Sequence, residues 1–445
     1  MALSDILDIR VEFGLGAAGD SGSLWDSALW DEGVWSSNEI SWTDMTSLVE
    51  EFTTRSGKST ASSTVLKRTR TASAVFTMDN TTGAFVPDGV STPGFLTLRP
   101  GRYVRVLARP THKPPVNIPD GTTWTDVTGR TWTARGSGMF KSAGGTEASW
   151  EPIWYGRIDT IDNRHDRGAL TALVKCTDSF ADLAVDSQVA VAAEGAGETA
   201  SARITRILDR IGWPLDRRDI APGGYTMQAT TLAGDALELC GITTDSAGAD
   251  FWQKPDGVLA WRDQGWKSET VDWIFGGLTG MPVHSVTPEW TSFRIVNEAH
   301  VSRAGGTEQI VSDSLSRAIY GRRTHTRLDL VNDQDADVAQ LGNLWVTALK
   351  WDQQIVTEVS VLAQDEATAE FMVGVSIGDL IQLSVDTIHG WSYTVLEHVS
   401  AIADDVTPEG WVMTLGLTPS TVPNEYGPYA RPEYSSAFHL GGPDA

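Results

Sequence analysis

The chain is poor in cysteine: Cys176 and Cys240 are the only two among its 445 residues, and no Cys-x-x-Cys pair occurs. A disulfide framework and a zinc ribbon both require more cysteines at closer spacing, so the sequence excludes both. We therefore expect the two thiols to be small buried side chains.

Long apolar runs are missing as well. No segment reaches the ~18 consecutive apolar residues of a membrane-spanning helix. The stretch from Met1 to Asp8 also lacks the basic region and apolar run of a secretory signal peptide. We expect a protein with no membrane segment that is made in the cytoplasm and is not exported by a signal peptide.

Basic residues are few relative to acidic ones, 34 against 58, which gives a formal net charge of -24. A surface that grips nucleic acid needs clustered Lys and Arg to neutralise phosphates, so we expect no sequence-specific nucleic-acid binding. A channel along which DNA slides is compatible with this charge, because an acidic wall repels phosphates.

Catalytic and ligand-binding motifs occur only in incomplete form. Gly14 to Gly19 spells GxGxxG after a predicted strand, but small polar residues follow where a dinucleotide site needs a helix. Gly374 to Gly378 spells GxSxG, yet the residues after it alternate as a strand. The eight histidines show no HxH, HxxxH or HExxH spacing. We therefore predict no catalytic, metal-binding or cofactor-binding residue and no enzyme activity.

Strand sequence closed by turns is what the chain does contain. Ala74 to Met78 alternates, Asp79 to Gly83 consists of turn residues, and Tyr103 to Leu107 alternates again. Helical spacing appears from Ser201 to Ile211, with Thr199 or Ser201 as the cap. The same spacing appears at two more places, and a strong hairpin lies between them. These segments are Thr231 to Cys240, Ala336 to Lys350, and the hairpin from Phe251 to Trp261.

The fold class predicted from this pattern is mainly β with an α+β middle. Hydrophobic residues make up 41% and charged residues 21%, as in globular proteins, and the length predicts about three domains. We expect two antiparallel β-barrel domains flanking a small α+β domain. Their predicted ranges are 1–185 with insertions at 19–45 and 109–150, then 186–285 for the α+β domain, 286–422 for the second barrel, and 423–445 for an extended tail.

Tryptophan is abundant, with 18 residues against eight Tyr and 12 Phe, and several lie in the predicted loop insertions. Two interpretations stay open for the first insertion: a docking surface for protein or sugar, or tryptophans that close their own loop. Self-packing is favoured for the hairpin in the second insertion. The candidate interaction residues are Trp25, Trp30, Trp35, Trp124 and Trp132.

Six short segments, taken in order, resemble the tail hub of long-tailed siphophages, a baseplate-hub-like minor tail protein found especially in phages of actinobacteria. Each segment alone is structural, and only their order is specific. They are Met78-Asp79-Asn80 to Phe85-Val86-Pro87-Asp88-Gly89, Leu98 to Gly101, Tyr155-Gly156-Arg157-Ile158, Arg206 to Pro214, Asp256 to Leu259, and Tyr320-Gly321-Arg322-Arg323.

This resemblance implies a homotrimer in the virion, made in the host cytoplasm, whose two tube-type barrel domains per chain form a ring at the tail tip. The ring would adapt the sixfold tail tube to the threefold tip and line or gate the DNA channel during genome ejection. Implied partners are the distal tail protein ring, the tape measure protein, and other minor tail or receptor-binding proteins. A carbohydrate-binding module or glycoside hydrolase acting on the host cell wall is the alternative, and the hub of a contractile injection apparatus is a third possibility.

Overall fold

The computed structural model describes most of the chain. The described residues are 6–17, 40–57, 71–83, 85, 100–111, 123–125, 131–133, 149–166, 169–185, 187–188, 193–231, 233–277, 280–291, 294–351, 353–386 and 392–420. Within them, no helix is long and apolar enough to cross a membrane.

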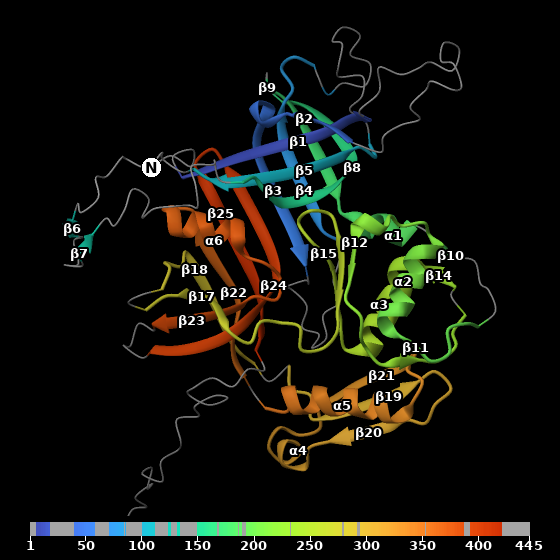
Figure 1. Cartoon of the computed structure of the whole chain (residues 1–445). Coiled ribbons are helices and arrows are strands. Elements are labelled where there is room, and N and C mark those ends of the chain that lie inside the picture. Colours follow the sequence, from blue (N-terminus) through green and yellow to red (C-terminus); the bar gives the residue numbers. More distant parts are fainter. Residues whose placement is uncertain are drawn as a thin grey trace, which may run out of the picture.

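A 13-stranded sheet that draws strands from both ends of the chain dominates the fold (Figure 1). Its main path runs β18 (Ser285–Thr291), β22 (Gln353–Leu362), β25 (Gly410–Pro419), β24 (Ser392–Thr407), β3 (Val49–Gly57), β4 (Ser73–Asp79), β9 (Ala169–Thr177), β8 (Glu151–Asp166), β5 (Tyr103–Pro110), β1 (Leu7–Ala17) and β2 (Ile40–Asp44). Off this path, β23 (Leu380–Asp386) pairs with β24, and β17 (Val271–Phe275) pairs with β23.

All pairs in this sheet are antiparallel except β17 with β23. The described strands close no barrel, because the path ends at β18 and β2. A mainly β protein with a large antiparallel sheet is thus what the structure shows. One hydrophobic core contains side chains from both ends of the chain, including Phe13, Phe76, Phe371 and Trp411.

Strand β4 illustrates why the sequence forms this sheet. Its burial alternates, with Ala74, Phe76 and Met78 facing the core, as the apolar alternation predicts. The following turn is built by its own side chains: Asp79 Oδ1 accepts the Thr81 N–H at 2.8 Å. The predicted turn from Asp79 to Gly83 is therefore confirmed in the structure, with Gly83 at a φ of 72°.

A middle unit of helices and a hairpin packs beside the sheet, as the sequence predicts. Helix α2 (Ala200–Arg210) has Thr199 as its N-cap, and Thr199 accepts the Ala202 N–H. Helix α3 (Ala236–Ala247) begins later than the predicted Thr231, because Asp235 supplies the cap by accepting the Glu238 N–H. The hairpin is β15 (Asp250–Gln253) with β16 (Leu259–Arg262), and β12 (Arg218–Ile220) joins it in parallel.

A small separate unit is inserted between β18 and β22. Its sheet has the order β20 (Gln309–Ser312), β19 (Glu298–Arg303) and β21 (Thr324–Leu330), and helix α5 (Asp335–Leu349) packs on one face. The predicted helix from Ala336 to Lys350 is confirmed by α5. The sequence pattern assigned β19 and β20 to the second barrel-type domain, whereas the structure pairs them with each other and with β21, around a core of their own.

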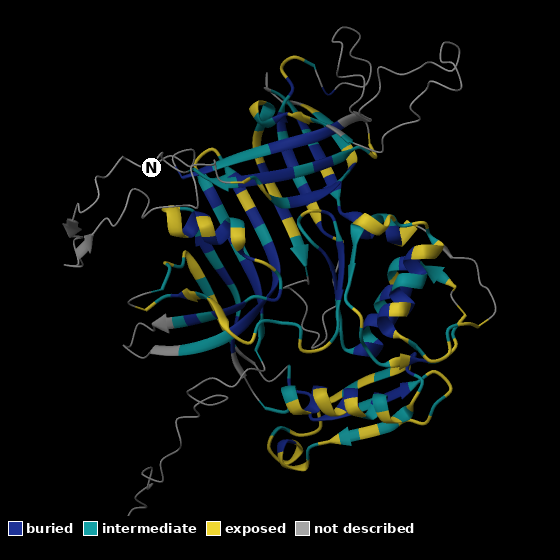
Figure 2. Ribbon diagram, in the orientation of Figure 1, coloured by how far each residue is buried: buried dark blue, intermediate teal, exposed yellow. Residues whose placement is uncertain are grey.

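Three further helices lie where the sequence pattern shows none. They are α1 (Ser179–Val185), α4 (Ser314–Tyr320) and α6 (Glu366–Gly374). Helix α6 starts at a capping box formed by Asp365 and Thr368, and Phe371 and Met372 enter the core shared by both halves of the sheet. Figure 2 shows the buried residues, in dark blue, along the strands of the sheet.

Short pairs complete the described secondary structure. These are β6 (Thr123–Thr125) with β7 (Thr131–Thr133), β10 (Ser187–Gln188) with β14 (Gly234–Asp235), and β11 (Glu198–Thr199) with β13 (Thr226–Met227). Two single-turn 3-10 helices lie at Thr46–Leu48 and Leu215–Arg217.

Gly57, at the end of β3, allows a close backbone approach that can be tested. Its φ is 87°, and a Cβ there would lie 2.5 Å from the Ser400 carbonyl oxygen, whereas Gly83 has a φ of 72° and open space. Gly83→Ala should lower the free energy of unfolding by about 1 kcal/mol, the cost of the left-handed conformation. Gly57→Ala should lower it by about 3 kcal/mol, because overpacking adds to that cost. Urea unfolding measures both values, and equal losses would contradict the close approach.

Candidate functional site

The described residues hold no cluster of three or more His, Cys, Asp or Glu side chains that could bind a metal ion. Cys176 and Cys240 are free and buried, as predicted, and burial raises the pKa of both thiols. They therefore stay protonated and poorly nucleophilic at neutral pH. In the GxSxG segment, the Ser376 N–H donates to the Asp379 carboxylate at 3.0 Å, and a strand follows, as the sequence predicts. These groups therefore indicate no reactive site among the described residues. The polar contacts that hold the units together are the candidate functional features.

The first of these contacts is the seam where β3 pairs with β24. Asp404 stands opposite Thr54 in this pair and is buried. Its carboxylate accepts the Thr54 hydroxyl at 2.6 Å and the Trp411 indole N–H at 3.0 Å. One side chain therefore links β3, β24 and β25, that is, both ends of the sequence.

Burial also sets the protonation states of two carboxyl groups on β24. It raises the pKa of Asp404 to about 6, against the two hydrogen bonds that lower it. Burial likewise raises the pKa of Glu397, on the same strand, to about 8, against the Val356 N–H and the charge of Arg294. Glu397 is thus largely neutral at pH 7, which removes the cost of a buried charge inside the sheet.

A second junction joins the sheet to the middle unit, and three of the segments flagged by the sequence converge there. The Gly101 N–H donates to the Ile158 carbonyl at 2.7 Å, and Arg157 Nε donates back to the Gly101 carbonyl at 3.2 Å. In the middle unit, Gly257 lies so close to Tyr155 that an added Cβ would be 2.5 Å from its ring. The Gly257 turn therefore packs between units, and the Gly101 turn packs within the sheet.

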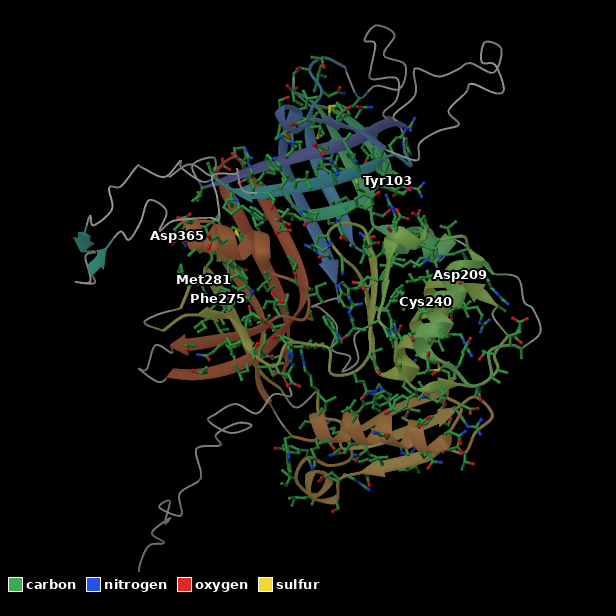
Figure 3. All side chains as sticks on the ribbon, in the orientation of Figure 1. Tyr103, Asp209, Cys240, Phe275, Met281 and Asp365 are labelled. Carbon is green, nitrogen blue, oxygen red and sulfur yellow. The ribbon has the colours of Figure 1, made fainter. Side chains whose placement is uncertain are left out.

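Gln253 and Arg217 reinforce that junction from the middle unit. The buried Gln253 amide accepts the Ser179 N–H and donates to the Tyr155 carbonyl, both at 2.8 Å. The Arg217 guanidinium lies 5.2 Å from the ring centroid of Tyr103 and 4.9 Å from that of Tyr155. Figure 3 labels Tyr103 at the edge of the sheet next to the middle unit.

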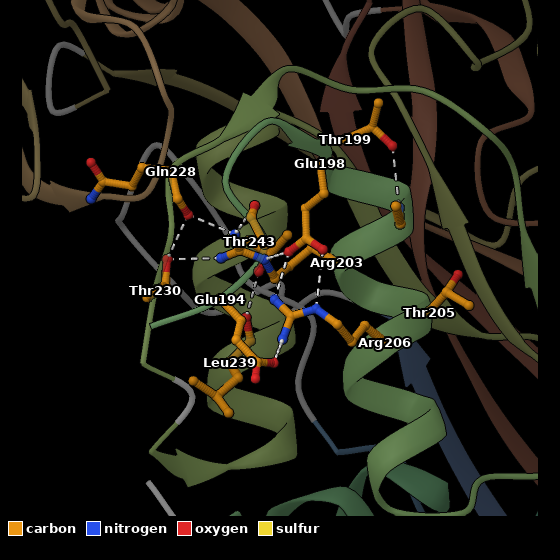
Figure 4. A network of polar contacts seen from close by, with 12 residues as sticks. Glu194, Glu198, Thr199, Arg203, Thr205, Arg206, Gln228, Thr230, Leu239 and Thr243 are labelled. Atoms are coloured by element: carbon orange, nitrogen blue, oxygen red, sulfur yellow. Dashed lines mark hydrogen bonds and ion pairs between the residues drawn. The ribbon is translucent and has the colours of Figure 1, made fainter. Parts of the chain in front are cut away.

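An ion network fixes the segments around α2 (Figure 4). Arg203, with only 1% of its surface exposed, pairs with Glu198 and donates to the Thr230 hydroxyl at 2.8 Å and the Gln228 carbonyl at 2.7 Å. Glu198 also accepts two bonds from Arg206, at 2.6 and 3.0 Å. A buried guanidinium with this many acceptors orders two chain segments at once.

Arginines also cover aromatic rings on the outer face of β1 and β5. Arg10 and Arg109 lie 4.3 and 4.5 Å from the ring centroid of Trp150, and Arg105 lies 4.3 Å from that of Trp42. Arg105 is also ion-paired with Glu12 at 2.6 Å. Since guanidinium groups stack on these rings, the aromatic side chains of this face stabilise the sheet and do not form a bare platform for sugars.

The candidate interaction residues fall largely outside the described part. Trp25, Trp30 and Trp35 lie outside the described residues. Trp124 and Trp132 are register partners in the antiparallel β6–β7 pair, so the predicted hairpin is present; their side chains lie outside the described part. The sequence pattern marks Asp404 and Asp405 as an acidic pair and predicts a solvated face; this is wrong for Asp404, which pairing with β3 buries, whereas Asp405 is exposed. Gln253 and Arg203 carry no local signal, because their partners are distant in sequence or their burial depends on the fold.

No family model matches the sequence, and no curated protein matches it either. Solved structures do share its fold. The tail protein from Neisseria meningitidis MC58 aligns with a TM-score of 0.55 at 13% identity, over 94% of this chain and 97% of that one. The 43 kDa tail protein of prophage MuSo2 from Shewanella oneidensis aligns with a TM-score of 0.52 at 13% identity, over 92% and 97%. The chain therefore has the fold of these two tail proteins along nearly its whole length.

Asp404 makes the stability of the fold depend on pH. Its folded pKa of about 6 exceeds the unfolded value of 3.8, so the folded state binds the proton more tightly. Its contribution to the free energy of unfolding is therefore full below about pH 4 and is lost as pH rises through about 6. Between about pH 4.5 and about pH 7.5, the free energy of unfolding of Asp404→Asn should therefore fall by about 2 kcal/mol less than that of the wild type.

Denaturant unfolding across this pH range measures the difference. Asp405→Asn is the matched control, because Asp405 is the exposed neighbour on the same strand. A pH dependence of Asp404→Asn that parallels the wild type would contradict the assignment.

Arg203 should matter far more than its neighbours in the network. Arg203→Met removes the buried partner of Glu198 and the donor to the Gly195 and Gln228 carbonyl groups, and should lower the free energy of unfolding by about 3 kcal/mol. Arg210→Met removes only a partly exposed pair with Glu194 and should cost less than about 1 kcal/mol. Thermal unfolding of both variants tests this ranking, and similar losses would refute it.

Proposed function

We propose that the chain is a non-enzymatic structural protein of a phage tail tip, the hub of a siphophage tail. The observation that carries this proposal is the fold shared with two tail proteins, at TM-scores of 0.55 and 0.52, over more than nine-tenths of every chain. At 13% identity this likeness shows the fold alone, so the function rests on what the architecture is suited to do.

The architecture suits a rigid building block. Strands from both ends of the sequence form one sheet around one core, and buried polar contacts fix the middle unit to it. Asp404, Gln253 and Arg203 hold parts of the chain together, and their side chains form their hydrogen bonds within the chain. Such a body offers fixed surfaces to neighbours, which is what an assembly component requires.

We further propose that three copies form a ring in the virion. The two halves of the sheet would act as two barrel-like segments per chain, giving six around the tail channel. The ring would adapt the sixfold tube to the threefold tip, and would contact the distal tail protein ring, the tape measure protein and other minor tail or receptor-binding proteins. The net charge of -24 per chain supports a channel that DNA passes without sticking.

The mass of the free assembly tests this proposal. Native mass spectrometry of the purified full chain at micromolar concentration, checked by light scattering, should show three copies of the 48.1 kDa protomer. A chain that stays monomeric in both measurements would overturn the ring. A closed assembly of another copy number would overturn the threefold symmetry.

A further inference from the structure

A cluster of charged side chains on the small inserted unit is centred on His300. His300 lies on β19, on the face opposite the one that α5 covers, and Glu298 lies two residues before it on the same face. Glu308 is the last residue of the turn at 304–308, which joins β19 to β20. Strand β20 forms the outer edge of this sheet, and β21 forms the edge that contacts the middle unit (Figure 1).

Both ring nitrogens of His300 lie at hydrogen-bond distance from carboxylates. Nδ1 is 2.6 Å from Glu308 Oε1, and Nε2 is 2.7 Å from Glu298 Oε1. A neutral imidazole carries one N–H and can donate to only one of these oxygens, whereas an imidazolium donates to both. The geometry therefore fits the charged form of His300, which links the turn to β19.

The other charged groups around His300 are two arginines. Arg322 Nε donates to Glu298 Oε1 at 2.6 Å, and Arg322 Nη2 lies 3.1 Å from His300 Nε2, so this cation opposes protonation of the ring. Arg317 of α4 lies 3.2 Å from Glu298 Oε2. The residues that pair with His300 on the two neighbouring strands are uncharged, and they are Ile310 and Thr326.

Glu298 and Glu308 respond differently to the loss of the proton from His300. Glu298 keeps Arg317 and Arg322, whereas His300 is the one cation paired with Glu308 within the described part of the chain. The bonds to Glu298 and Glu308 hold the pKa of His300 above its ordinary value of 6.5, and burial opposes them. The stabilisation is therefore full below about pH 6.5 and is lost as pH rises through the folded pKa.

Asp335 limits how far a release of Glu308 can extend. Asp335 accepts Arg303 Nε at 2.6 Å and the Thr307 N–H at 3.4 Å, so the turn stays anchored up to Thr307. Arg303 Nη1 also donates to Gln228 Oε1 of the middle unit at 3.0 Å. None of these contacts involves His300, so the contact between the small and middle units does not depend on its proton.

We propose that His300 is a pH-sensitive latch on the edge strand β20. As an imidazolium it binds Glu308 and holds the start of β20 against β19. As a neutral imidazole it releases Glu308, and this end of the edge strand frays. The inference goes beyond the proposed function and does not depend on it, because the latch lies within one chain.

Hydrogen–deuterium exchange of the full-length protein, followed by mass spectrometry, tests the latch. Labelling times are scaled to the intrinsic exchange rate at each pH. In the wild type, the protection of segment 308–312 should fall about tenfold between about pH 5.5 and about pH 9, because a hydrogen bond between charged groups is lost. The protection of segment 226–231, which contains Gln228, should stay constant.

Two variants and a control assign the effect to the latch. His300→Gln keeps a hydrogen-bonding side chain without a charge, so segment 308–312 should show the low protection at both pH values. Glu308→Gln removes the carboxylate and should have the same effect, which keeps the test decisive if His300→Gln does not fold. His284→Gln is the matched control, because His284 is exposed and precedes β18, and it should keep the wild-type pH dependence. Circular dichroism must show native folding for every variant.

Three results would overturn the inference. The first is a wild-type protection of segment 308–312 that does not change with pH. The second is a pH-dependent loss that both His300→Gln and Glu308→Gln retain, because another group then causes it. The third is an equal loss in segment 226–231, because the opening is then not confined to the edge strand.

Discussion

The pairing of β3 with β24 is the constraint on which the rest of the structure depends. It brings together residues about 350 positions apart, as the Thr54 to Asp404 hydrogen bond records. The entropic cost of closing a loop grows only slowly with its length, and the units in between have cores of their own. Across the seam one core is shared, and Trp411 and Phe371 belong to the same buried cluster as Phe13 and Phe76 from the other end of the chain.

Fixed geometry follows from this seam. Gln253 and Gly257 hold the middle unit against the sheet, and the buried amide of Gln253 bonds to backbone groups of two elements. The small unit is held by its β18–β22 stem and by contacts with the middle unit, among them the Arg327 to Asp245 pair at 2.7 Å. Side-chain contacts therefore join all three units, as the proposed role in an assembly requires.

Turns and helix caps could be predicted from the sequence, whereas contacts between residues distant in sequence could not. Turn residues from Asp79 to Gly83 and the cap at Thr199 act within a few residues, so their patterns predict the structure. Alternation in β19 shows a strand but not its partner, so its separate sheet could not be foreseen. Helix α6 spans only residues 366–374, too few for a clear helical periodicity, and the sequence analysis assigns no cap at Asp365. Burial of Asp404 depends on strands from both ends of the chain, which no local pattern contains.

In the proposed assembly, one body built from both chain ends repeats around a shared axis. Single-particle electron cryomicroscopy of the purified assembly tests this claim most directly. We predict a threefold ring in which every protomer contains the continuous sheet with β3 and β24 paired, and in which both halves of the sheet border a central passage. A map in which β3 and β24 are separated, or in which the sheets surround no passage, would contradict it.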